Sequence, residues 1–126
     1  MREPINFCYE LRVYQNARAA AMEIFQLSKS FPIEEKYSMT DQIRRSSRSI
    51  CANIAESWMK RRYPAAFVSK LSDALGEASE TWTWIEFAAD CGYLKIESAV
   101  ALKEKYARIQ AQLMTMSQNP SDWLTR

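Results

Sequence analysis

The side chains best suited to chemistry lie in one stretch of the sequence, from Asp41 to Pro64. Its basic residues are Arg44, Arg45, Arg48, Lys60, Arg61 and Arg62. On a helix that turns by about 100° per residue, the first three fall on one side, and the last three follow at the far end of the same helix. Nucleic acid is bound through its phosphates by several Lys and Arg side chains on one face, so these six residues are candidates for binding RNA or DNA.

A second interpretation of the same arginines is that they are solvated or paired with carboxylates. Residues 34–62 carry a net charge of +3, whereas residues 63–90 carry −4, so a positive segment is followed by a negative one. The potential partners, on a neighbouring helix or on another subunit, are Asp73, Glu77, Glu80 and Glu86. The planar guanidinium suits carboxylates in protein interfaces as well as phosphates, and the sequence leaves both interpretations open.

Asn53 and Glu56 form a polar motif within the same stretch. A buried polar pair can take part in catalysis, but such side chains more often satisfy hydrogen bonds of the backbone or of a neighbouring helix. We therefore predict a structural role for these two residues, with an arginine as one potential partner.

The sequence contains no histidine, so it lacks the commonest general base and the commonest metal ligand. It also has no glycine-rich phosphate loop and no nucleophile beside a base, and we predict no enzymatic activity, no catalytic residue and no cofactor. Asp73, Glu77 and Glu80 share one helical surface, but di-metal bundles use Glu-x-x-His pairs, so no metal site is predicted. The three cysteines form no C-x-x-C motif, which predicts reduced thiols.

Length and composition predict a single domain over residues 1–126, with a short N-terminal segment, 1–9, and a C-terminal tail, 118–126. Only two glycines and four prolines occur, which favours long uninterrupted helices. The sequence shows neither a signal peptide nor an apolar stretch of the about 20 residues that a membrane span needs. The predicted location is the cytoplasm, without membrane contact.

Apolar spacing predicts four helices, and the chain is therefore expected to be all-α. They run from Glu10 to Lys29, from near Ser38, from Pro64 to a cap at Gly92, and from about Ile96 to Ser117. Because the connections are short, neighbouring helices should run antiparallel, which gives an up-down-up-down four-helix bundle.

The second helix has two features that predict its start and its packing. Ser38 and Asp41 have the spacing of a helix start, at which the serine hydroxyl accepts a hydrogen bond from an unpaired amide. A narrow stripe of isoleucine and small side chains predicts a close helix–helix contact; it consists of Ile43, Ser47, Ile50, Ile54 and Ser57.

Apolar side chains outside the expected core predict that the protein associates with itself. Trp82 and Ala89 are expected in the inner stripe of the third helix, whereas Trp84 and Phe87 point away from this stripe. On the fourth helix the expected inner residues are Val100, Tyr106, Ala107, Leu113 and Met114, and the expected outer ones are Leu102, Ile109 and Met116. A contiguous exposed apolar surface usually marks an interface, although wide apolar helix faces are an alternative explanation.

The sequence also resembles a bacterial four-helix bundle family, first described as proteins encoded in intervening sequences of 23S ribosomal RNA genes and also called S23 ribosomal proteins. The resemblance covers about residues 7–113, and its most specific part is "QIRRSSRSICANIAES", from Gln42 to Ser57. Phe31–Pro32, Glu35–Tyr37 and Gly92–Tyr93 support it. Ser57 departs from the family pattern, in which glycine is usual.

The resemblance implies a homo-oligomer, a ring of five subunits, without catalytic residues. Relatives include accessory proteins of diversity-generating retroelements, which bind nucleic acid and a reverse transcriptase through basic surfaces. Two functions therefore stay open. The first is a non-enzymatic homo-oligomer that binds RNA or DNA through the six basic residues. The second is a protein-interaction scaffold with no nucleic-acid role, in which the arginines lie at subunit contacts.

Overall fold

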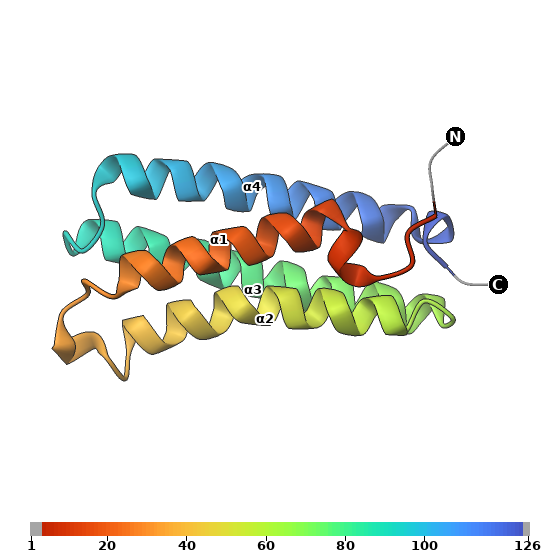
Figure 1. Ribbon diagram of the computed structural model, residues 1–126, viewed down its shortest axis with the longest axis horizontal. Coiled ribbons are helices and arrows are strands. Elements are labelled where there is room, and N and C mark those ends of the chain that lie inside the picture. The colour runs from red at the N-terminus through yellow and green to blue at the C-terminus, as the bar shows by residue number, and fades with distance from the viewer. Residues whose placement is uncertain (1–3, 125–126) are drawn as a thin grey trace.

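The computed structural model describes residues 4–124, and four helices account for most of them. Their bounds are α1 Arg12–Ser28, α2 Met39–Met59, α3 Pro64–Asp90 and α4 Ile96–Gln118. Three short 3-10 turns accompany them, η1 Cys8–Glu10, η2 Ile33–Glu35 and η3 Pro120–Asp122, and no strand occurs among residues 4–124. Successive helices run in opposite directions along the long axis, as the colours of Figure 1 show, so the predicted all-α bundle is confirmed.

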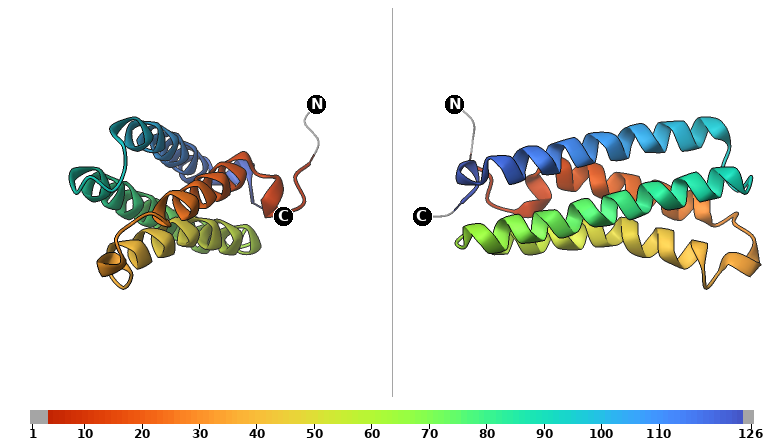
Figure 2. Two further views of the ribbon diagram at one scale, coloured as in Figure 1. Left: turned by 60° about the vertical axis from the view of Figure 1, so that its left-hand side comes forward. Right: turned by 180° about the vertical axis from the view of Figure 1, so that it is seen from behind.

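Each helix packs against two others, which gives a closed four-helix arrangement. α2 and α4 both lie between α1 and α3, and the most extensive contact joins α2 to α3. Figure 2 shows α2 and α3 side by side from two further directions. No helix among residues 4–124 combines the length and the apolar character needed to cross a bilayer.

The ends of α2 and α3 follow from local sequence. Pro64 occupies the first turn of α3, where a missing amide hydrogen costs nothing. Gly92 ends the helix with φ of 78°, and the amides of Gly92 and Tyr93 donate to the carbonyls of Ala89 and Ala88, as in a Schellman cap.

The prediction for Ser38 was wrong in one detail. Ser38 precedes α2, but its hydroxyl donates to Glu35 Oε1 at 2.6 Å and caps no amide.

The seam between α2 and α3 is the centre of the core. All five residues of the predicted α2 stripe are buried. Ala74 and Ala78 of α3 have no exposed surface and share a helix face with Thr81, which contacts α2, so their small side chains let the two helices approach closely. Thr81 Oγ1 donates to Ser46 Oγ at 2.8 Å across the seam, and both side chains are fully buried. A buried hydroxyl on each helix is thereby satisfied.

The predicted inner face of α4 was partly wrong. Tyr106 and Leu113 are fully buried as expected, but the expected outer residues, Leu102, Ile109 and Met116, are buried as well. Val100 and Met114, which were placed inside, are half exposed. Residues 102, 106, 109, 113 and 116 repeat every three or four positions and so form one face of the helix, and this face is the one buried where α4 packs against α1 and α3.

On α3 the core contains Thr81 and Ala88, whereas Trp82 and Ala89 are only partly buried. Phe87 is exposed as predicted, and Trp84, which is partly buried, packs against its ring at 5.9 Å between centroids. Most of the apolar side chains from which self-association was predicted are thus wholly or partly buried in the core, and among them only Phe87 is exposed.

Candidate functional site

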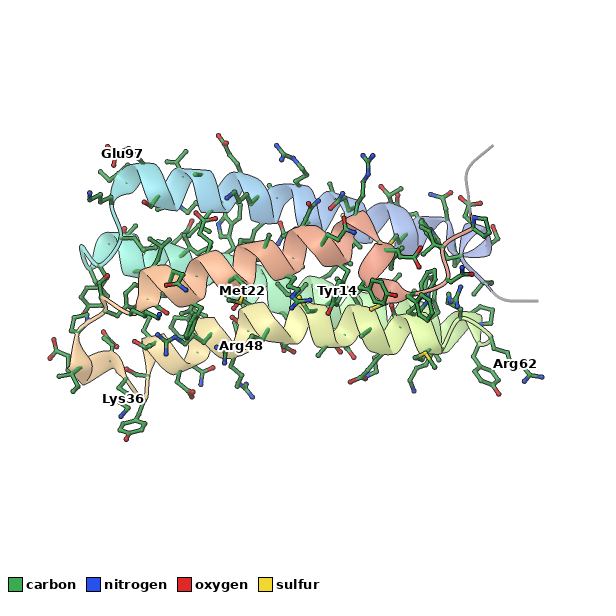
Figure 3. All side chains as sticks on the ribbon, viewed as in Figure 1. Tyr14, Met22, Lys36, Arg48, Arg62 and Glu97 are labelled. Atoms are coloured by element: carbon green, nitrogen blue, oxygen red, sulfur yellow. The ribbon has the colours of Figure 1, made fainter. Side chains whose placement is uncertain are left out.

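The six basic candidates on and after α2 form two separate groups. Sixteen residues separate Arg44 from Lys60, which corresponds to about 24 Å along a helix. Figure 3 shows Arg48 in one half of α2, with Lys36 beyond it, and Arg62 at the opposite end of the molecule. The structure therefore does not bring the six residues together into one surface.

The first group is organised around the ring of Phe25 on α1. Arg44 Nε donates to Ser28 Oγ at 2.8 Å, and the Arg44 guanidinium carbon lies 4.9 Å from the centre of the Phe25 ring. The Arg48 guanidinium carbon and Lys29 Nζ lie 5.6 and 4.8 Å from the same centre. Each cation is attracted to the negative face of the ring, so three positive charges gather around one aromatic side chain.

No carboxylate of residues 4–124 forms an ion pair with these cations. The ion pairs in that part of the chain use Lys70, Lys103 and Lys105 instead. Two of the predicted arginine partners are taken in this way, since Asp73 pairs with Lys70 and Glu86 with Lys103. Within residues 4–124 no direct ion pair joins the α2 arginines to these carboxylates, whereas a solvated face and pairing with another subunit both stay open.

Arg45 acts on Glu77 of α3 at longer range. Burial raises the pKa of the Glu77 carboxyl, and the neighbouring charge of Glu80 adds to this effect. The positive charge of Arg45 opposes both and favours the ionised carboxylate. Arg45 is itself exposed, so its guanidinium stays accessible to other anions.

The first group borders a shallow pocket of about 460 Å³ at the start of α2. Its lining residues are Lys36, Tyr37, Thr40, Asp41, Arg44, Arg45 and Arg48. We call the five cations in and beside this pocket, Lys29, Lys36, Arg44, Arg45 and Arg48, the basic patch. Asp41 is the one carboxylate in the lining among the described residues. Cations gathered around a hollow are suited to binding an anion that is larger than a single carboxylate.

Reasoning from the sequence missed three members of this site, Lys29, Lys36 and Tyr37. Lys29 comes from the end of α1, and the other two come from the connection before α2, so no single helical projection groups them with the arginines. Tyr37 belongs to the Glu35–Tyr37 part of the family resemblance, and that was the only signal in the sequence.

The second group is divided between structure and surface. The Arg61 guanidinium carbon lies 3.5 Å from the centre of the Trp58 ring, and Arg61 Nε donates to the Trp58 carbonyl at 2.8 Å. Burial lowers the pKa of Arg61, which agrees with its position against the ring. Lys60 and Arg62 remain exposed. Arg61 is therefore already engaged within the chain, and this group offers fewer accessible charges than the basic patch.

Asn53 and Glu56 do not contact each other by hydrogen bond. Asn53 Nδ2 donates to the carbonyl and hydroxyl of Ser49, one turn earlier, at 2.9 and 3.2 Å. Glu56 pairs with Lys70 of α3 at 2.9 Å, and this bond lowers the pKa of Glu56 and raises that of Lys70. These are contacts to the backbone and to a neighbouring helix, and the partner of Glu56 is a lysine rather than an arginine.

A larger pocket, of about 630 Å³, lies between the start of α1 and the end of α4. Its lining is mixed, with Leu11, Val13 and Met116 among the apolar residues and Arg12 and Arg108 among the charged ones. It lies near Arg61 of the second group, because Trp123 in its lining packs against Trp58, and nothing in the sequence pointed to it. Within residues 4–124 no group of three or more metal-ligating side chains comes together.

Known proteins with a similar sequence or fold agree with the four-helix bundle described above. The family model of the 23S rRNA-intervening sequence proteins matches residues 9–115 of the chain. The crystal structure of a protein with unknown function from the S23 ribosomal protein family, from Bacteroides thetaiotaomicron, is similar in fold with a TM-score of 0.76. The two sequences are 32% identical over 84% of this chain and 95% of that chain. A comparison with curated proteins finds no match.

Proposed function

The chain belongs to the family of 23S rRNA-intervening sequence proteins, and from that membership we propose that it is a non-enzymatic homo-oligomer that binds RNA or DNA through the basic patch. The observation that carries this proposal is the group of five cations without an ion-paired carboxylate in residues 4–124. Neither the family description nor that of the structural relative indicates catalysis.

The contacts within the patch support phosphate as its ligand. Arg44 is fixed by Ser28 and Phe25, so its guanidinium loses little freedom when it binds. Arg45 and Arg48 are exposed on adjacent turns of the same helix and can contact neighbouring phosphates. Because each phosphate that is neutralised releases counterions, such binding gains free energy at low salt and weakens as salt rises.

The proposal is tested by the salt dependence of binding. We expect the wild-type protein to bind fluorescently labelled RNA or DNA with an affinity that falls steeply between about 50 and about 200 mM salt. The variant Arg45→Gln/Arg48→Gln removes two exposed cations and leaves Arg44 in place. For a single strand, its plot of log K against log salt should be shallower by about 1.4, since each lost phosphate contact accounts for about 0.7.

The matched control removes the same charge from elsewhere. Lys95 and Arg108 are both exposed at or on α4, and Lys95→Gln/Arg108→Gln should bind with nearly the wild-type affinity and salt slope. The proposal is wrong if the wild-type protein binds neither RNA nor DNA, or if the two double variants lose affinity equally.

A protein-interaction scaffold is the second candidate, and exposed apolar residues favour it. Phe87, Ile96, Val100 and Met114 are all at least half exposed. In this alternative the patch arginines lie between subunits, and Arg45→Gln/Arg48→Gln should lower the mass measured by light scattering while the helical circular dichroism is kept. Under the first proposal the mass of this variant stays unchanged.

A further inference from the structure

Tyr37 is the most exposed aromatic side chain beside the basic patch. Its side chain is 86% exposed, and it lines the same pocket as Arg44, Arg45 and Arg48. The side chain makes no hydrogen bond to any residue of the described chain, so the ring contributes little to the stability of the fold. Proteins that bind single-stranded nucleic acid typically combine an exposed aromatic ring, on which a base stacks, with several cations that contact the phosphates.

The segment that carries Tyr37 is firmly anchored. The Glu35 carboxylate accepts a hydrogen bond from Ser38 Oγ at 2.6 Å and another from Tyr93 Oη, beyond the end of α3, at 2.9 Å. Phe31 is buried, and its ring lies 5.6 Å from that of Tyr93. Tyr37 thus projects from a fixed turn, and ordering this residue on binding costs less entropy than ordering a mobile loop.

The faces of the Tyr37 ring are more accessible than those of Phe25, the other aromatic residue of the patch. Phe25 is contacted by Lys29, Arg44 and Arg48 and is partly buried. Tyr37 has one such neighbour, Lys36, whose Nζ lies 5.3 Å from the ring centre. A flat ligand can therefore stack on Tyr37 without displacing the contacts that hold the arginines.

We propose that Tyr37 stacks on an unpaired base of single-stranded RNA or DNA while Arg44, Arg45 and Arg48 contact the adjoining phosphates. This inference rests on the proposed function and specifies its ligand. A duplex keeps its bases stacked on one another, so they cannot lie on a side chain outside the helix, whereas the bases of a single strand are free to do so. The patch then binds phosphates of either form, and Tyr37 adds affinity for the single strand only.

The test compares two variants on three ligands. Tyr37→Ala removes the ring, and Tyr37→Trp keeps a ring that can stack. The ligands are a labelled single strand, the duplex of the same sequence, and a single strand whose central nucleotides lack bases. We expect Tyr37→Ala to weaken binding of the intact single strand roughly 5- to 150-fold, and to leave the duplex and the base-free strand unchanged. Tyr37→Trp should bind the intact strand at least as tightly as the wild type.

Two results would overturn the inference while the proposed function stands. One is an equal loss of affinity for all three ligands in Tyr37→Ala, and the other is no loss for any of them, in each case with salt-dependent binding that depends on Arg45 and Arg48. A fall in mass of Tyr37→Ala in light scattering would show instead that Tyr37 is a subunit contact, which also contradicts stacking. If the wild-type protein binds none of the ligands, the proposed function itself fails.

Discussion

At the scale of single residues, Arg44 and Arg61 are held by the same two contacts. In each case the guanidinium lies over an aromatic ring and Nε donates to an oxygen, Ser28 Oγ for Arg44 and the Trp58 carbonyl for Arg61. Neither arginine has a carboxylate partner in residues 4–124. Each guanidinium is thereby held in place by a ring and an oxygen acceptor of the same chain.

Removal of Arg61 should destabilise the protein. We expect Arg61→Ala to lower the free energy of unfolding by about 1–2 kcal/mol, because it removes both the ring contact and the hydrogen bond. Arg62→Ala, which changes the same charge at an exposed neighbour, should alter it by less than about 0.5 kcal/mol. Urea denaturation followed by circular dichroism measures both, and equal values for the two variants would contradict a structural role for Arg61.

The Glu35 carboxylate should make stability depend on acid pH. The hydrogen bond from Ser38, and to a smaller extent that from Tyr93, holds the pKa of Glu35 below its ordinary value of 4.5. Because the folded pKa is the lower one, the stabilisation is present above the unfolded pKa and is lost as pH falls through the folded pKa. We expect Glu35→Gln to melt below the wild type at neutral pH and to approach it as pH falls below 4.5.

The control for Glu35 is its exposed neighbour. Glu34→Gln removes a carboxylate for which residues 4–124 offer no hydrogen-bond partner, and its melting temperature should follow the wild type at every pH. A difference between Glu35→Gln and the wild type that stays constant from neutral to acid pH would show that ionisation of Glu35 contributes nothing.

At the scale of elements, the α2–α3 seam depends on small side chains. Ala78 is fully buried and lies one turn before Thr81, whose hydroxyl bonds to Ser46 of α2, so Ala78→Leu must push the two helices apart or force side chains out of their preferred rotamers. We expect a loss of about 1–3 kcal/mol in the free energy of unfolding. Ala65→Leu, at an exposed position of the same helix, should change it by less than about 0.5 kcal/mol. A neutral effect of Ala78→Leu would mean that the seam is looser than described.

The sequence was a good guide to the helices and a weaker one to the faces of α3 and α4. On α2 the isoleucines stand among serines and arginines, so one apolar stripe is possible and it was predicted correctly. On α4 apolar residues occur on more than one side, and the choice between Leu102 and Val100 depends on how α4 packs on α1 and α3. That information lies in other elements and not in the periodicity of one helix.

The candidate site shows the same limit. Arg44, Arg45 and Arg48 could be grouped because they share one helix, whereas Lys29, Lys36 and Tyr37 are brought to them by the turn between α1 and α2. The contact between Arg61 and Trp58 spans three residues at a helix end, and its spacing could have indicated it.

At the scale of the whole molecule, an exposed row of apolar residues lies along α4. It includes Ile96, Val100 and Met114, which are 74%, 51% and 52% exposed. Two of these are the residues that were placed in the core from the sequence, so self-association now rests on a different surface from the one first predicted. Five subunits are what the family resemblance implies.

Substitution on this row should dissociate the assembly. We expect the wild-type protein to show a mass of several subunits by light scattering at micromolar concentration, and Val100→Glu/Met114→Glu to shift towards the mass of one chain, because charges in an apolar interface lose their hydration. Native mass spectrometry of the wild type then counts the subunits. The control, Ala19→Glu/Ala65→Glu, places the same charges at exposed positions of α1 and α3 and should keep the assembly intact. A wild-type protein that has the mass of a single chain would refute association.

The contacts of Trp58 determine how the protein can be attached to an instrument. Trp58 Nε1 donates to the Asn6 carbonyl, and the Trp58 ring packs edge-on against Trp123, so both terminal segments lie at one end of the bundle, opposite the connection between α1 and α2 (Figure 1). A reporter dye or a sensor tether attached to the described part of either segment therefore lies at the pole opposite the basic patch. Immobilised in this way, the protein presents the patch to solution, and the tether does not compete with the ligand.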